Sequence, residues 1–205
     1  DLSFSDLLLY GRASVEGPDK VVLLGHVRPT TAQTIYREDL VGELFDMADV
    51  PVASVAFAKG CISEAQVNKP EQSQPVNVVA VPVRWEGELI AVLTRETLPP
   101  LARPSSELER TYNAVFARLA RMIEAGAYPF AHDADDQMKA PRVGDGVVVL
   151  DRERRVEYNS PNAVSALHRL GVHASAEGLP LSDIGIDDHF VRQAFATRSA
   201  VFSEL

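Results

Sequence analysis

The stretches Gly144-Asp-Gly-Val-Val-Val-Leu-Asp151 and Arg155-Val-Glu-Tyr-Asn-Ser-Pro-Asn-Ala163 set the expected fold of the second half of this chain. A short apolar run ends at Asp151, and the charged residues 152–154 then turn the chain. Apolar and polar residues then alternate through Val156 and Tyr158, as in a strand, and the Asn-Ser-Pro sequence that follows ends this pattern. This order predicts a strand, a tight turn, a second strand and the start of a helix, without a set of catalytic side chains.

The residues after this hairpin predict two helices and the beginning of another strand. Apolar residues recur at helical spacing over Pro161–Leu170, and Gly171 ends that helix. A capped turn follows near Leu179, and Asp188–Thr197 predicts a second helix. Ala200–Leu205 has strand composition but is cut short, and the chain opens without Met, so we expect a fragment of a longer protein.

The clearest pattern in the first half is a β-hairpin. Val76–Val83 predicts a strand, and Leu89–Thr94 predicts its partner. Between them, Arg84–Glu88 forms the connection, in which Gly87 is available for a positive φ angle. This hairpin is expected to lie within an antiparallel sheet.

Other segments of the first half give weaker predictions. Leu7–Arg12 and Lys20–Arg28 form a plausible second hairpin. Asp39–Met47 has apolar residues at helical spacing and predicts a short helix. Val50–Phe57 is compatible with either a helix or a strand, and the polar segment Gly60–Gln74 predicts a loop.

A long amphipathic helix is predicted over Ser106–Ala125. Ser106 and Glu109 fit a capping box, in which each side chain satisfies a free backbone donor. Gly126 ends the helix, and the polar, acidic residues 131–142 predict a boundary between two domains. The apolar face of this helix suits packing on its own sheet, a seam between two copies, or both.

Bulk composition narrows the class of protein. The chain has 205 residues, 46% hydrophobic and 24% charged, as is usual for soluble globular domains. Its net charge of −9 is spread along the chain, which disfavours direct nucleic-acid binding. Cys61 is the single cysteine, so no intrachain disulfide can form and a reducing cytoplasm is expected. No apolar run is long enough for a membrane helix.

Two sets of residues resemble known sensory folds. Asp145–Asp151 and Val156–Ala163 resemble the opening of a PAS domain, a family that implies a five-stranded antiparallel sheet with helices across one face. Val78–Val83 and Gly87–Thr94 resemble the closing hairpin of a GAF domain, which in that family leads into a long exit helix. Residues 143–205 are too few for a whole PAS sheet.

In combination with Met122–Gly126, Pro141–Gly146 and Tyr158–Gly171, the chain resembles the N-terminal sensor region of actinobacterial cytosolic sensor histidine kinases. This implies an α+β fold of two tandem sensory domains, each an antiparallel sheet flanked by helices. The expected parts are a GAF-like domain over 1–128, a linker over 129–142 and a truncated PAS domain over 143–205.

The resemblance also implies partners. It implies a homodimer, an unidentified small-molecule signal, an ATP-dependent kinase domain outside this chain and, through that domain, a response regulator. No cofactor, metal or catalytic residue is expected in the fragment itself. Phosphate-loop and nucleophile-elbow motifs are absent, and His168 and His173 are spaced poorly for two metal ligands.

Three candidates for lining a ligand pocket are Phe57, Cys61 and Tyr158. Two of them also have a structural interpretation: Cys61 is then a partly buried small apolar residue, and Tyr158 packs in the sheet while Asn159 caps the next helix. A dimerisation or protein-interaction scaffold without a ligand is the main alternative function, and a small-molecule enzyme is the third. A filled, dry core would favour the scaffold.

Overall fold

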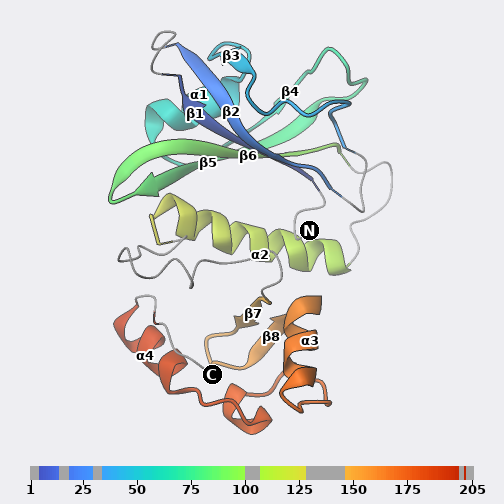
Figure 1. Cartoon of the computed structure of the whole chain (residues 1–205), viewed down its shortest axis with the longest axis vertical. Helices are drawn as coiled ribbons and strands as arrows, with labels where there is room; N and C mark the ends of the chain where they lie inside the picture. The colour runs from blue at the N-terminus through green and yellow to red at the C-terminus, as the bar shows by residue number, and fades with distance from the viewer. Residues whose placement is uncertain are drawn as a thin grey trace. The chain divides into compact units, whose positions relative to one another are not determined.

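The computed structural model describes residues 5–13, 19–29, 34–99, 107–127, 146–198 and 201 (Figure 1). The chain divides into two compact units, Asp1–Ala131 and His132–Leu205, and each is described by itself.

The first unit is built on a six-stranded sheet in the order β3-β2-β1-β6-β5-β4, with every neighbouring pair antiparallel. Buried and less buried residues alternate along much of the central strands. Successive side chains of a strand point to opposite faces, so this pattern favours a sheet with one face packed on a core. The strands are β1 (Asp6–Arg12), β2 (Lys20–Val27), β3 (Leu44–Asp46), β4 (Ser63–Val67), β5 (Val76–Trp85) and β6 (Glu88–Thr97).

Both predicted hairpins are confirmed. β5 and β6 pair directly, and their turn places Glu86 at φ 50° and Gly87 at φ 85°. Two successive positive φ angles are typical of the tight turns that match the twist of a hairpin. β1 pairs with β2 in the same antiparallel manner.

Two helices pack on the sheet. The segment Val50–Phe57 is helical from Pro51: Val50 is the N-cap of α1 (Pro51–Lys59), which has proline in its first turn and is followed by Gly60 with φ 64°. The long helix is confirmed as α2 (Glu107–Glu124), and Gly126 after it has φ 69°. Ser106 of the predicted capping box lies outside the described residues.

The helix predicted over Asp39–Met47 is wrong. The segment forms turns and the short edge strand β3, because the backbone pairs with β2 instead: Leu23 donates to the carbonyl of Glu43 (2.9 Å) and accepts from Gly42 (2.8 Å). Gly42 has φ 90°, which a helix excludes. The loop predicted over Gly60–Gln74 is wrong in part, because it contains β4.

The two faces of the sheet have different coverings. The inner face, as we call it, carries Leu8, Tyr10 and Leu23, which pack in one apolar core with α1. The outer face contacts α2, where the Arg95 guanidinium lies 4.9 Å from the ring centre of Phe116. Neighbouring residues of a strand point to opposite faces of the sheet. Arg95 therefore contacts α2 on the outer face, whereas the next residue, Glu96, lies on the inner face.

The second unit contains a hairpin followed by helices, as predicted. β7 (Val148–Leu150) pairs with β8 (Val156–Asn159), followed by α3 (Pro161–Arg169), the 3₁₀ turn η2 (Leu181–Ile184) and α4 (His189–Thr197). Its apolar core includes Val156, Leu167, Leu181 and Val191. The predicted strand over Ala200–Leu205 lies outside the described residues apart from Val201, which is not in a strand.

The cap of α3 differs from the prediction. Ser160, rather than Asn159, is the N-cap, and its Oγ accepts from the backbone N–H of Ala163 (3.3 Å) and of Val147 (2.9 Å). This hydroxyl therefore ties the hairpin to the helix. Gly146 is required beside it, because a Cβ there would lie 2.5 Å from the Ala163 backbone.

Candidate ligand-binding site

A buried carboxylate organises one end of the inner face. Asp6 is fully buried and accepts three hydrogen bonds, from His26 Nε2 (3.1 Å), Thr34 Oγ1 (2.7 Å) and the backbone N–H of Ile35 (2.7 Å). Because a carboxylate only accepts, the His26 Nε2 atom carries the proton of that bond. We call Asp6, His26, Thr34 and Ile35 the Asp6 cluster; it fixes the segment after β2 to β1.

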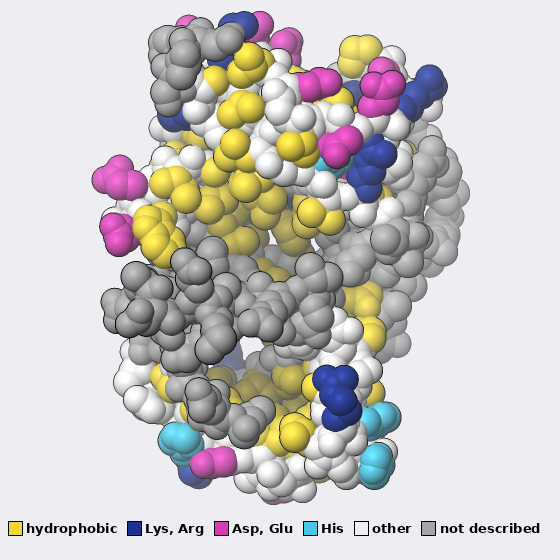
Figure 2. Space-filling model, viewed as in Figure 1, with side chains coloured by type: hydrophobic (Ala, Val, Ile, Leu, Met, Phe, Trp, Pro, Cys, Tyr) yellow, Lys and Arg dark blue, Asp and Glu magenta, His cyan; other side chains and the backbone are white. Residues whose placement is uncertain are grey.

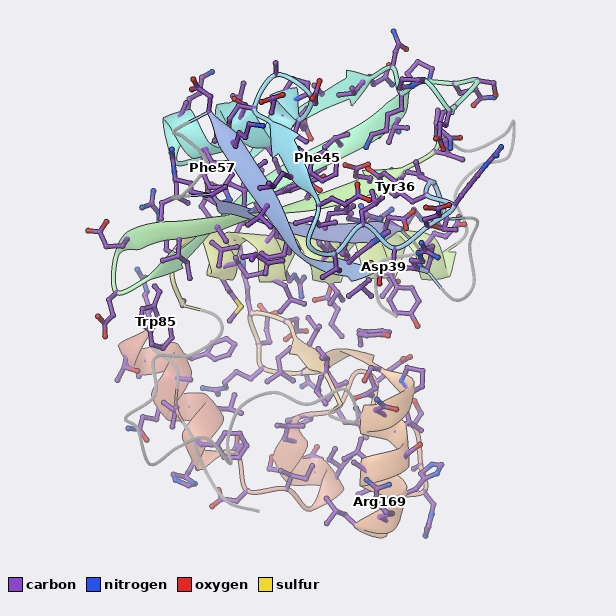
Figure 3. The ribbon with its side chains drawn as sticks, turned by 45° about the horizontal axis from the view of Figure 1, so that its top comes forward. Tyr36, Asp39, Phe45, Phe57, Trp85 and Arg169 are labelled. Atoms are coloured by element: carbon purple, nitrogen blue, oxygen red, sulfur yellow. The ribbon has the colours of Figure 1, made fainter. Side chains whose placement is uncertain are left out.

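A second buried carboxylate, Glu96 of β6, joins segments from opposite edges of the sheet. Tyr36, between β2 and β3, donates its hydroxyl to Glu96 Oε2 (2.6 Å). Lys69, between β4 and β5, places Nζ 2.6 Å from the same oxygen and also donates to the Tyr36 hydroxyl. These three residues form what we call the Glu96 cluster. Figure 3 shows Tyr36 at the far end of the first unit from Phe57.

The tyrosines near Glu96 are held neutral. Burial raises the pKa of Tyr36 far above its ordinary value, and the nearby carboxylate of Glu96 raises it further. Burial and Glu96 likewise raise the pKa of Tyr10, while a hydrogen bond with Tyr36 acts in the opposite direction. Both hydroxyls therefore keep their protons throughout the neutral pH range, and that of Tyr36 donates to Glu96.

A small cavity of about 20 Å³ lies between the Glu96 cluster and the start of α1. Its wall includes Glu96, Lys69, Thr94 and the first residues of α1. Thr94 is 1% exposed, and its hydroxyl has no hydrogen-bond partner within the described part of the chain. A space of this size admits about one water molecule, which would satisfy that hydroxyl.

A larger groove adjoins this cavity on the side of the edge strand. It measures about 380 Å³ and is lined by α1 and by Ser63–Asn68, which includes all of β4. Pro51, Val52 and Val67 line both the cavity and the groove. The groove is within the size range of small-molecule sites, and the cavity forms a polar end for it.

None of the three sequence-based candidates lines the cavity or the groove. Phe57 is buried in the core, with the Arg12 guanidinium 5.0 Å from its ring centre. Cys61 is exposed, so its interpretation as a partly buried apolar residue is wrong. Tyr158 is 8% exposed and lies in β8 of the second unit, consistent with packing in that hairpin.

Sequence reasoning missed the buried polar residues of both clusters, of which Glu96 and Lys69 line the cavity and His26 belongs to the Asp6 cluster. Glu96 has one detectable signal, because it continues the inward alternation of Val92 and Thr94 beyond the predicted strand. His26 is hidden by a β-bulge: Gly25 and Leu23 pair with consecutive residues of β1, which leaves Leu24 unpaired and reverses the alternation. Lys69 lies between strands, where no periodicity indicates burial.

The outer face presents two large aliphatic side chains at bulges. Leu24 is the unpaired residue of β2, and Ile90 is skipped in the same way between β5 and β6. Each is 53% exposed. A Cβ at Gly11 would lie 2.7 Å from Leu24 Cδ1, so glycine at that position makes room for this side chain. Hydrophobic side chains gather over the strands of the first unit in Figure 2.

Metal-site clusters and membrane-spanning helices were sought among the described residues. Among the described residues, no group of three or more His, Cys, Asp or Glu side chains has the arrangement of a metal site. None of the helices in the described ranges combines the length and the apolar character needed to cross a membrane.

Comparisons with known proteins bear directly on the family. Residues 1–115 match the family model described as the GAF domain of histidine kinase PdtaS. The chain is 36% identical over 202 residues to the sensor histidine kinase PdtaS of Mycolicibacterium smegmatis, covering 96% of this chain and 40% of that protein. The PdtaS of Mycobacterium tuberculosis is 36% identical over 188 residues, covering 89% of this chain and 37% of that protein.

A solved structure shows the same relationship. The sensor region of a sensor histidine kinase superposes with a TM-score of 0.66 at 32% identity, covering 97% of this chain and 72% of that one. The chain spans about two fifths of the length of the curated relatives. The α+β, GAF-like fold and the resemblance to actinobacterial sensor kinases are confirmed. The chain belongs to the family of PdtaS-type histidine kinase GAF domains and corresponds to the sensor region of such a kinase.

Proposed function

We propose that the first unit senses a small-molecule signal at the cavity and groove beside α1, and that it regulates an ATP-dependent histidine kinase domain outside this chain. The observation that carries this proposal is the Glu96 cluster in the cavity wall. Buried ion pairs contribute little net stability, because desolvating two charges costs about as much as their attraction returns. Charged groups buried beside a cavity are therefore better explained by recognition than by folding.

The mechanism is a shift between two states. In the present state the cavity admits only about one water molecule, so a ligand that extends from the groove into the cavity would displace the Lys69 side chain from Glu96. Lys69 is suited to move, since its side chain is 23% exposed and lies between strands. A signal would change kinase activity only as far as it binds the open state more tightly than the closed one.

The domain bounds, the location and the partner of the kinase are proposed from the family to which the chain belongs. We propose GAF-like residues 1–128, a linker over 129–142 and a truncated PAS domain over 143–205; the β7–β8 hairpin followed by α3 supports the last. The kinase would act in the cytoplasm and pass its phosphoryl group to a response regulator.

A homodimer is part of this proposal. We propose that Leu24 and Ile90, two aliphatic side chains that are each 53% exposed at bulges of the sheet, contribute to its interface. Phe57, Cys61 and Tyr158 remain candidates for ligand contact only if a ligand remodels their surroundings.

One observation favours an alternative, a scaffold without a ligand. A cavity of about 20 Å³ leaves the inner core nearly filled. In that case the first unit would transmit only contacts with other proteins, and opening the cavity would have no effect on the kinase.

The experiment compares kinase variants that contain this chain. Lys69→Met removes the cation that closes the cavity, and we expect autophosphorylation to change by about fivefold or more with an unchanged KM for ATP. Lys20→Met is the matched control, because Lys20 forms only an exposed ion pair with Asp46. Unchanged autophosphorylation in a folded Lys69→Met kinase would support the scaffold and contradict sensing at this cavity.

A further inference from the structure

Helix α1 connects the cavity with the end of α2. Its first residues, including Val52 and Ala53, line the cavity. Its last turn leads through Gly60 to Ile62, which contacts α2. One helix of 9 residues therefore has one end at the candidate binding site and the other end at the helix that leaves the first unit.

A directed hydrogen bond joins the segment after α1 to α2. The backbone N–H of Ile62 donates to Oε1 of Glu124 over 2.7 Å. Glu124 is the last residue of α2. Because the acceptor is a carboxylate, this bond is stronger than a bond between neutral groups. It ties the segment after α1 to the exit turn of α2.

Arg84 of β5 completes this junction. Its guanidinium donates from Nη2 to the carbonyl of Gly60 (2.9 Å) and from Nη1 to the carbonyl of Gly87 (3.1 Å). Gly126, just after α2, lies so close that a Cβ on it would be 3.5 Å from the Cβ of Arg84. Figure 1 shows the C-terminal end of α2, in yellow, at the side of the β5–β6 hairpin.

The local structure favours movement of α1 as a rigid body. Of the four buried side chains of α1, Val52 and Phe57 pack in the core, whereas Ala53 and Ala56 are small, which limits interlocking with the sheet at those two positions. No side chain caps the first turn, whereas Gly60 closes the last turn by donating to the carbonyl of Ala56 (2.9 Å). A displacement at the cavity end is therefore expected to appear at Gly60 and Ile62.

We infer that the junction of Ile62, Arg84 and Glu124 transmits a displacement of α1 at the cavity to the exit turn of α2. Glu124 is a positioning residue in this route, since it contacts the segment after α1 and not the cavity. The inference rests on the proposed function, because the displacement matters to the kinase only if the cavity receives a signal. In this route, the junction is the part of the first unit through which the signal reaches α2.

The test uses the 205-residue chain without any ligand. Val52→Ala enlarges the cavity and Ala53→Val fills it. Each substitution is introduced separately into three backgrounds: the chain with Glu124 unchanged, the Glu124→Ala variant and the Glu124→Gln variant. Amide chemical shifts are measured at Ile62 and at residues 125–126. The glutamine keeps an oxygen acceptor for Ile62 N–H, and Arg121→Ala serves as a control on an exposed residue of the same helix.

With Glu124 or with the Glu124→Gln substitution, each cavity substitution should shift both Ile62 and residues 125–126. In Glu124→Ala, the shift at Ile62 should persist while that at 125–126 falls by about threefold or more. Equal shifts at 125–126 with Glu124 and with alanine would overturn the inference, as would shifts confined to the cavity. If one cavity substitution prevents folding, the other decides. Because no signal or kinase is involved, this result is independent of the Lys69→Met test.

Discussion

The two buried carboxylates of the inner face differ in what surrounds them. The Asp6 side chain and the His26 side chain are each 1% exposed, and a backbone amide completes that cluster. Glu96 is paired instead with Lys69, whose side chain is 23% exposed, and with the hydroxyl of Tyr36. Only the second cluster lines the cavity. The comparison indicates a fixed structural cluster and, beside it, a cluster that is able to open.

The largest expected effect is the loss of Asp6. Asp6→Ala leaves His26 Nε2 and the Ile35 amide without their acceptor and removes the shorter of two hydrogen bonds from Thr34, so we expect the free energy of unfolding to fall by about 3–5 kcal/mol. Urea denaturation measures this change. Asp46→Ala, which breaks an exposed pair with Lys20, should cost about 1 kcal/mol or less. Similar losses in the two variants would remove the distinction between a structural and a surface carboxylate.

A smaller effect is expected for Lys69. Lys69→Met should lower the free energy of unfolding by about 1–3 kcal/mol, because Lys69 is partly exposed and Glu96 keeps its bond from Tyr36. The same denaturation experiment provides the measurement. If this loss equalled that of Asp6→Ala, the Glu96 cluster would be as essential to folding as the Asp6 cluster, which the account does not allow.

The free energy of unfolding at alkaline pH tests the role of Tyr36 in the Glu96 cluster. Because the pKa of Tyr36 is raised in the folded state, only the unfolded state releases this proton as pH rises past about 10. The stabilisation is complete below that pH and is lost above it. Tyr36→Phe should be less stable at neutral pH but should lose stability less steeply between about pH 9.5 and 11. Lys69 is retained in both proteins, so parallel curves would contradict the assignment to Tyr36.

The smallest effect on folding is expected at the outer face. Leu24→Ser changes a side chain that is 53% exposed, so the free energy of unfolding should change by about 0.5 kcal/mol or less. Self-association, measured by sedimentation, should weaken if this bulge contributes to a homodimer. A dimer of undiminished affinity would show that the bulge residues lie outside the interface.

The sequence predicts the central strands and α2 because their apolar residues follow one period over many positions. Asp39–Met47 fails for the opposite reason: its helical spacing is short, and pairing of Glu43 with Leu23 in β2 outweighs it. β4 is missed because an edge strand with exposed polar residues has no alternating apolar pattern.

The candidate site was less predictable than the fold. Its charged residues come from separate strands and connections, and their burial depends on how these segments meet over the sheet. The bulge at Leu24 also reverses the expected direction of His26. Aromatic and thiol side chains suggested Phe57 and Cys61, whereas the buried Glu96 and its partner Lys69 form the charged part of the cavity wall.

The most direct test of the central claim is amide hydrogen exchange in the intact chain. The account predicts that the Ile35 amide, bonded to Asp6, exchanges only when the first unit unfolds globally. The backbone N–H of Gln72, which donates to the carbonyl of Lys69 (3.0 Å), should exchange through a local opening of lower free energy. Equal opening free energies at the two amides, or faster exchange at Ile35, would contradict a fixed Asp6 cluster beside a movable Glu96 cluster.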